Sequence, residues 1–164
     1  HVTGVQTCAL PIYDYKKIAE DLNKAGEACK KSGIQLCYHN HDFEFERING
    51  QLPFDILTKE TDEKLLKLEI DLYWASRAGQ DPINLFQQHK GRVALWHTKD
   101  MDKTEKKNFT EVGNGVIDFA TIFKNAKLSG MKHFFVEQDV CPGSPFDSIK
   151  QSIGYIKSNL VQYL

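Results

Sequence analysis

Strand-length apolar segments and amphipathic segments alternate along most of this chain, and that alternation constrains the fold most strongly. Four segments are predicted to be strands, namely IQLCYH, KLLKLEIDLYW, RVALWHTKD and HFFVEQD. A segment with helical features follows each of them, and one more, residues 13–33, precedes the first. Strict alternation of strands and helices predicts a parallel sheet whose helices form the crossover connections.

Several predicted helices have recognisable ends. Asp81 precedes Pro82 as an N-cap precedes the first helical residue, and Gly91 marks the exit of that helix. Asp118 is expected to cap a single helix that ends at Gly130. Between the first strand and the next helix, DFEFERINGQL is predicted to be a small hairpin that turns at Asn49–Gly50.

The two faces of each predicted strand differ in polarity. Leu66, Leu68 and Ile70 share one face, whereas Lys67, Glu69 and Asp71 share the other. An open doubly wound sheet, the alternative, would be apolar on both faces, so a barrel with a polar mouth is favoured. A (β/α)₈ barrel typically needs about 250 residues. We therefore expect an α/β fold of parallel βα repeats that forms the C-terminal half, strands five to eight, of a TIM barrel.

The first twelve residues, HVTGVQTCALPI, are unlike the rest of the chain. They lack an initiator Met, a helical or strand period and a secretory pattern, and they resemble a translated sequencing adapter. We expect residues 1–12 to be a non-native, disordered extension and residues 13–164 to be a partial barrel domain. A native start would then lie upstream, and the compartment stays undefined, with the cytoplasm slightly favoured over the periplasm.

Composition excludes several classes of protein. A net charge of −1 without a stripe of Lys and Arg argues against nucleic acid as a partner. The sequence contains no apolar run of about 18 residues, so no membrane span is predicted. The four cysteines are irregularly spaced and form no CxxC pair, which indicates reduced, mostly buried thiols rather than a disulfide framework.

Four potential metal ligands lie at the ends of the four predicted strands. His39, Asp71, His97 and Glu137 all fall on the predicted inward face, at the carboxyl end where barrel enzymes have their active sites. Mixed nitrogen and oxygen ligands suit Mn²⁺, Co²⁺, Zn²⁺ or Mg²⁺ with an open position for substrate. The sequence thus predicts a divalent metal centre.

Other side chains near these strand ends are candidates for catalysis or substrate binding. His41 is a candidate acid or base, although hydrogen bonding within a loop is equally compatible with its position. Four residues are candidates for substrate contacts: Lys99 for a phosphate or carboxylate, Trp74 for a sugar ring, Asp139 for a hydroxyl, and Glu44 from the hairpin. Solvated side chains, or packing in the case of Trp74, are the structural alternatives.

Five motifs, GIQLCYHNHDFEF, LEIDLYWASRAGQDP, RVALWHTKD, VGNGVIDF and FFVEQD, resemble the sugar phosphate isomerase/epimerase family with the xylose isomerase-like TIM barrel. The resemblance extends over residues 13–164 and implies a metal held by an acid, Asp, His and Glu. Asp71, His97 and Glu137 match the last three ligands, but His39 stands where many relatives have Glu. Since epimerases of this family are thought to use two opposed Glu residues, only Glu137 of that pair is clearly present.

The same fold includes a branch of three-zinc DNA-repair endonucleases, which this chain does not match. That branch requires a His three residues after the Asp ligand, and Trp74 occupies that position. A nuclease is therefore rejected.

Three functions remain open. The first is a metal-dependent sugar or sugar phosphate isomerase/epimerase, in which Glu137, His39 or His41 moves a proton next to a carbonyl through a metal-stabilised enediolate. The second is a lyase or hydratase of a keto-sugar or keto-inositol, which needs one base and one acid rather than two matched bases. The third is an inactive half-barrel whose unpaired edges promote binding or homo-oligomer formation.

Overall fold

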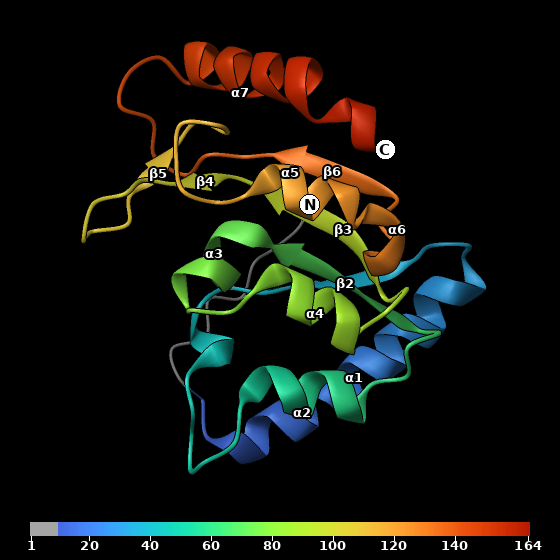
Figure 1. Ribbon diagram of the computed structural model, residues 1–164. Helices are drawn as coiled ribbons and strands as arrows, with labels where there is room; N and C mark the ends of the chain where they lie inside the picture. The colour runs from blue at the N-terminus through green and yellow to red at the C-terminus, as the bar shows by residue number, and fades with distance from the viewer. Residues whose placement is uncertain (1–9) are drawn as a thin grey trace. The chain divides into compact units, whose positions relative to one another are not determined.

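The computed structural model describes residues 10–164, which divide into two compact units (Figure 1). The first unit extends to Leu36 and includes Phe43–Leu66, and the second comprises Cys37–Asp42 and Lys67–Leu164. Most of the predicted N-terminal extension lies outside the described residues. Ile12, its last residue, is already the first residue of a helix.

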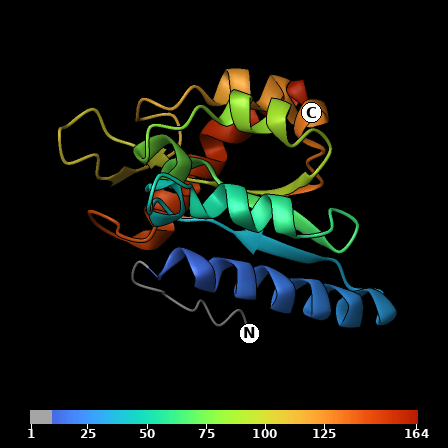
Figure 2. The same cartoon turned by 90° about the horizontal axis from the view of Figure 1, so that it is seen from below.

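The first unit is built around two helices that lie side by side, α1 (Ile12–Lys31) and α2 (Pro53–Glu60) (Figures 1 and 2). The Asn23 side chain joins α1 to the end of α2, since its amide donates to the Glu60 carbonyl at 2.9 Å. A Cβ at Gly26 would lie 2.9 Å from the Cβ of Leu65, so only glycine allows the chain to pass this close to α1.

The predicted hairpin of the first unit is reduced to its turn. Asn49 and Gly50 both have positive φ, 50° and 80°, and Ile48 and Gln51 form an isolated antiparallel bridge around them. The expected strand before the turn is wrong, because residues Phe43–Phe45 form a 3₁₀ helix, η1.

The second unit contains a four-stranded sheet with the order β1-β2-β3-β6. Its strands are β1 (Leu36–His39), β2 (Leu66–Asp71), β3 (Val93–Thr98) and β6 (His133–Val136). β2 pairs in parallel with β3, and β3 with β6. Strand order follows chain order without the reversal of a doubly wound sheet. The expected α/β fold of parallel repeats is confirmed.

The connecting segments differ from the prediction in two places. Residues 72–74, expected to prolong a strand, begin helix α3 (Leu72–Arg77), because the Asp71 side chain accepts a hydrogen bond from Trp74 N and caps it. The single helix expected between Asp118 and Gly130 is interrupted at Asn125. The helices of this unit are α4 (Pro82–Gln88), α5 (Phe119–Lys124), α6 (Ala126–Ser129), α7 (Pro145–Asn159) and the 3₁₀ helix η2 (Val161–Tyr163).

A small antiparallel hairpin, which the sequence did not predict, lies between β3 and α5. It is formed by β4 (Asp100–Met101) and β5 (Phe109–Thr110). The core of the second unit includes Trp96, whose ring stacks on Phe86 at a centroid distance of 5.2 Å. Both rings are fully buried, so the apolar face of β3 is anchored against α4.

The described cysteines, Cys29, Cys37 and Cys141, form no disulfide with one another and have intermediate exposure, so they are less buried than predicted. No helix within residues 10–164 combines the length and apolarity required to cross a membrane.

Candidate metal centre

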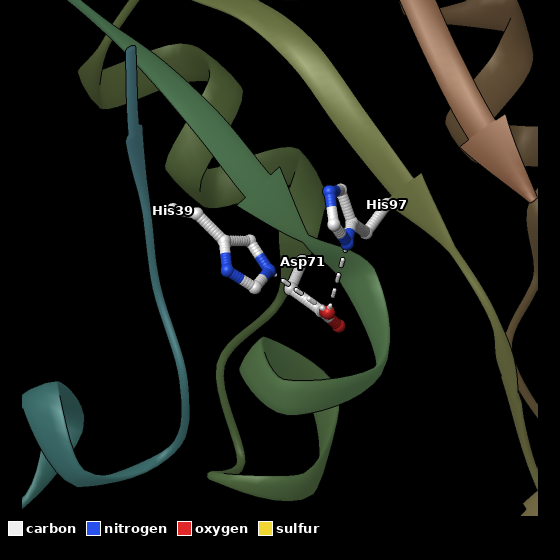
Figure 3. A group of neighbouring side chains, drawn as sticks. All are labelled: His39, Asp71 and His97. Carbon is white, nitrogen blue, oxygen red and sulfur yellow. Dashed lines mark hydrogen bonds and ion pairs between the residues drawn. The ribbon is translucent and has the colours of Figure 1, made fainter. Parts of the chain in front are cut away.

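Three predicted ligands converge in the second unit. His39, Asp71 and His97 offer ligand atoms that all lie within 4.8 Å of one another. Figure 3 shows the three side chains pointing toward one another from neighbouring strands. Asp71 Oδ2 is the common atom, 3.2 Å from His39 Nε2 and 3.8 Å from His97 Nδ1.

The sheet register and one asparagine fix the position of Asp71. Asp71 pairs with His97 across β2 and β3, which places both residues at the same level of the sheet. The Asn40 side chain accepts a hydrogen bond from Asp71 N at 3.0 Å, while Asp71 Oδ1 caps α3. The Asp71 side chain is fully buried. Its oxygens therefore have separate roles, and Oδ2 is the one directed at the histidines.

The geometry of these donors fits a divalent cation. Zinc ligands lie about 2.0–2.2 Å from the ion, so two ligand atoms on one ion are at most about 4.4 Å apart. Both separations from Asp71 Oδ2 are below that limit. Two imidazole nitrogens and one carboxylate oxygen suit Zn²⁺, Co²⁺ or Mn²⁺ better than Mg²⁺, which prefers oxygen alone.

Two glutamates flank His97. Glu137 Oε2 lies 2.7 Å from His97 Nδ1, and Glu69 Oε1 lies 2.7 Å from His97 Nε2. Burial alone would lower the pKa of His97, but the hydrogen bonds to Glu137 and Glu69 raise it to about 9. The His97 hydrogen bond in turn lowers the pKa of Glu137 to about 2. Glu137, the predicted fourth ligand, thus lies beside the three converging residues and contacts His97.

Lys99 lies among three carboxylates rather than in solvent. Its Nζ is 3.0 Å from Asp71 Oδ2, 2.7 Å from Glu137 Oε2 and 2.8 Å from Asp139 Oδ2. Burial opposes its charge, yet the carboxylates, Asp71 foremost, raise the pKa of Lys99 above its ordinary value. The predicted solvated lysine is wrong, and Asp139, proposed to bind a substrate hydroxyl, is an ion-pair partner of Lys99.

Aromatic side chains form one boundary of the site. The His41 ring is 4.9 Å from the His39 ring and 5.7 Å from the Trp74 ring, measured between centroids. Burial and the neighbouring His39 lower the pKa of His41 below 6.5. Lys99 Nζ lies 5.9 Å from the Trp74 centroid and 5.7 Å from that of Phe109 on the β4–β5 hairpin. Trp74 and His41 thus both adjoin the predicted ligands.

Glu44 belongs to the first unit, where it is part of η1 and only 1% exposed. The expectation of a solvated hairpin carboxylate is therefore wrong. The 3₁₀ turn buries the Glu44 side chain, and its charge contributes to raising the pKa of Tyr15 after the larger effect of burial.

Sequence reasoning missed three residues of the site. Glu69 could have been found, because it shares the predicted inward face and precedes Asp71 by one strand period. Asn40 stands between the two histidines of HNH, but its hydrogen bond to Asp71 N requires knowledge of the neighbouring strand. Phe109 lies between the third predicted strand and the helix capped by Asp118, in a segment that has no alternating pattern to indicate a hairpin.

Comparisons with known proteins agree with this fold. The family described as xylose isomerase-like TIM barrel matches residues 2–159. Inosose dehydratase of Clostridium beijerinckii is 28% identical over an alignment of 163 residues, and the match covers 88% of this chain and 54% of the relative. The chain thus spans about half the length of the curated relatives it matches.

Solved structures also resemble this chain in fold. A sugar phosphate isomerase/epimerase from Parabacteroides distasonis is 29% identical with a TM-score of 0.83, over 92% of this chain and 54% of that one. The IOLI protein, in a structure with a bound zinc atom, is 15% identical with a TM-score of 0.70, over 98% of this chain and 62% of that one, a similarity of fold alone.

Proposed function

The chain belongs to the xylose isomerase-like TIM barrel family, and we propose that it contributes the metal centre of a dehydratase acting on a keto-inositol or a related keto-sugar. Curated relatives with the name inosose dehydratase support this substrate class. The chemical argument comes from the environment of the two glutamates at the candidate centre.

The observation that carries the proposal is that both glutamates are bound to the same histidine. Glu137 and Glu69 each lie 2.7 Å from a different ring nitrogen of His97. An epimerase that works with two opposed bases needs two carboxylates free to reach opposite faces of one carbon. Elimination of water requires a single group that first accepts and then returns a proton, so this site suits a dehydratase better.

His39, Asp71 and His97 are the residues that would hold the metal. A divalent cation bound there would supply Lewis acidity toward the carbonyl oxygen of the substrate. The remaining steps belong to side chains of the chain itself.

His41 is the residue best suited to move the proton. Since burial lowers its pKa below 6.5, the imidazole is neutral at pH 7 and can act as a base. His41 removes the proton from the carbon next to the carbonyl, and the imidazolium then returns it to the departing β-hydroxyl group. One C–H and one C–O bond break, a C=C bond forms, and water leaves. Trp74, 5.7 Å from the His41 ring, offers an apolar face for the substrate ring.

A sugar isomerase or epimerase is the second candidate. The Parabacteroides distasonis structure with that name, 29% identical to this chain, favours it. In that case Glu137 would have to leave His97 before it could act as a base, because its hydrogen bond to His97 lowers its pKa to about 2.

The two reactions are separated by the fate of the substrate in deuterated water. The chain, loaded with Co²⁺ or Mn²⁺, is incubated with a panel of keto-inositols and keto-sugars, and products are identified by mass spectrometry and NMR. Loss of one water, with a hydroxyenone or its diketone tautomer as the product, supports the proposal. An isomer of unchanged composition that gains deuterium at carbon supports the epimerase, and unaltered substrate contradicts both.

A His41→Asn variant tests the assigned role. General acid–base catalysis contributes roughly 10²–10⁴-fold to rate, so kcat should fall by that factor while Co²⁺ affinity is unchanged. His133→Asn, at an exposed histidine of β6, is the matched control and should retain the rate.

A further inference from the structure

Lys99 is a deeply buried charged group beside the candidate centre. Its side chain is 1% exposed, and its Nζ contacts carboxylate oxygens of Asp71, Glu137 and Asp139 at 2.7–3.0 Å. A buried ammonium needs such partners, because removal from water is unfavourable for an unpaired charge. The proposed function assigns no role to this arrangement.

One oxygen atom is shared between Lys99 and the predicted ligands. Asp71 Oδ2 lies 3.0 Å from Lys99 Nζ, 3.2 Å from His39 Nε2 and 3.8 Å from His97 Nδ1. Asp71 Oδ1 instead accepts a hydrogen bond from Trp74 N, at the start of α3, while Oδ2 is the oxygen that faces the histidines and Lys99. A cation at the candidate centre and the Lys99 ammonium would therefore both depend on Asp71 Oδ2.

We propose that Lys99 is a built-in countercation that competes with the divalent metal for Asp71. An ion about 2.0–2.2 Å from Asp71 Oδ2 would lie within roughly 5 Å of the ammonium, close enough for strong repulsion in a buried site. Metal binding requires Lys99 to withdraw from Asp71. Glu137 and Asp139 then retain the ammonium. The role of Asp139, which is not a predicted ligand, is therefore to bind the displaced Lys99 side chain.

The inference rests on the metal-dependent function proposed above, and it predicts opposite effects from two substitutions beside the same centre. Lys99→Met removes the competitor while keeping an unbranched apolar stem. Asp139→Asn weakens the group that receives the displaced ammonium, so Lys99 is held more firmly at Asp71. Neither substitution alters a predicted ligand.

The test is the dissociation constant of Co²⁺, measured by titration of its visible absorbance in the full chain without substrate. Lys99→Met should bind Co²⁺ at least about tenfold more tightly, and Asp139→Asn about threefold more weakly, as expected for the loss and gain of one close charge interaction. Lys132→Met, at an exposed lysine preceding β6, changes the net charge equally and should alter the constant by less than about twofold, since distant surface charges are screened.

Thermal unfolding provides a second measurement. The melting temperature of metal-free Lys99→Met should fall, because three carboxylates lose their counterion, and the increase on adding Co²⁺ should exceed that of the wild type. If metal-free Lys99→Met does not fold, the variant is refolded with Co²⁺, and its release of metal to a chelator should be slower than in the wild type.

The outcomes separate this inference from the proposed function. Equal Co²⁺ affinity in Lys99→Met and wild type, or tighter binding by Asp139→Asn, overturns the competition alone. No Co²⁺ uptake by the wild type or any variant overturns both the competition and the metal-dependent function. Both conclusions come from Co²⁺ binding alone, so they do not depend on whether dehydratase activity is detected.

Discussion

Two fully buried aspartates, at the carboxyl ends of adjacent strands, have very different surroundings. Asp71, the last residue of β2, faces His39, His97 and Lys99 and accepts one backbone hydrogen bond, from Trp74 N. Asp100, two residues after β3, accepts four backbone hydrogen bonds instead. Their donors, at 2.8–3.1 Å, are the amides of Met101, Gly113, Gly115 and Ile117.

The difference separates a binding site from a structural anchor. Backbone amides that converge on Asp100 are fixed by the path of residues 100–117, and a Cβ at Gly115 would collide with the Asp100 carboxylate. The side chains around Asp71 can rotate, so their contacts can be exchanged for a ligand. Equal burial therefore does not indicate equal function. The two aspartates are distinguished by their partners, which are mainly side chains for Asp71 and backbone amides for Asp100.

The largest expected effect is the loss of the anchor. Asp100→Ala leaves four backbone amides without their acceptor, and each unsatisfied buried donor costs about 1–3 kcal/mol, reduced where water can enter. We expect the free energy of unfolding, measured with urea, to fall by about 3–5 kcal/mol. Asp21→Asn, at an exposed position of α1, is the control and should have little effect. A loss below about 1 kcal/mol would mean that Asp100 is not an anchor.

Asp71→Asn should show the converse behaviour. Asparagine can still accept the hydrogen bond from Trp74 N and cap α3, but it removes the charge directed at the histidines. Replacing a ligating carboxylate should weaken Co²⁺ binding by at least about 100-fold, because the loss of a group that only hydrogen-bonds to a ligand already costs about 10–100-fold in metal affinity. Isothermal titration calorimetry measures this effect. If Asp71→Asn destabilised the fold as strongly as Asp100→Ala and left metal affinity intact, the two aspartates would not differ in role.

The sequence allowed the Asp71 region to be predicted far better than the Asp100 region. Alternating polarity in LKLEID places Asp71 on the polar face of β2, and a parallel sheet brings strand ends together. Asp100 follows Lys99 in the same segment, yet its partners lie up to 17 residues away in a stretch without a period. The sequence around Gly113 and Gly115 did not indicate this anchor, because a carboxylate that accepts hydrogen bonds from distant amides leaves no local pattern.

The alternating pattern of a strand also does not predict charged contacts made by residues outside that strand. Lys99 was expected to bind substrate or to lie in solvent, because its contact with Asp139, three residues after β6, could not be inferred from a strand that had already ended. The split of the helix at Asn125 and the early end of β2 have local causes, namely capping hydrogen bonds that compete with propensity.

A smaller effect is expected from Glu69→Gln, which tests how His97 is oriented. Glu69 Oε1 lies 2.7 Å from His97 Nε2, whereas the other ring nitrogen, Nδ1, faces Glu137 and Asp71, so the contact with Glu69 fixes which nitrogen points toward the candidate centre. Glutamine retains an acceptor but loses the charge, so Co²⁺ affinity should fall by about tenfold. This is the lower end of the range for changes to a residue that hydrogen-bonds to a metal ligand. Glu105→Gln, on the exposed β4–β5 hairpin, should bind Co²⁺ as the wild type does. Unchanged affinity in Glu69→Gln would remove Glu69 from the site.

The smallest effect concerns Glu111, which resembles Asp100 in being a structural acceptor. Its Oε1 accepts the hydroxyl of Ser148 in α7 at 2.7 Å, and this hydrogen bond lowers the pKa of Glu111 below 4.5. A carboxyl group with a lowered folded pKa stabilises the fold above its unfolded pKa, and the contribution disappears as pH falls through the folded value. Stability from Glu111 should therefore be present at pH 7 and decline below about pH 4.5.

Urea unfolding of the wild type and Glu111→Gln at pH values from 7 to about 3 measures the contribution of Glu111 to the free energy of unfolding. The variant should be less stable by about 1 kcal/mol or less at pH 7, with a difference that shrinks toward pH 3. Ser148→Ala removes the donor and should reproduce the change in pH dependence, because the hydroxyl is the first cause of the lowered pKa. A difference that grew on acidification would mean that folding raises the pKa of Glu111, which would contradict its role as a hydrogen-bond acceptor comparable with Asp100.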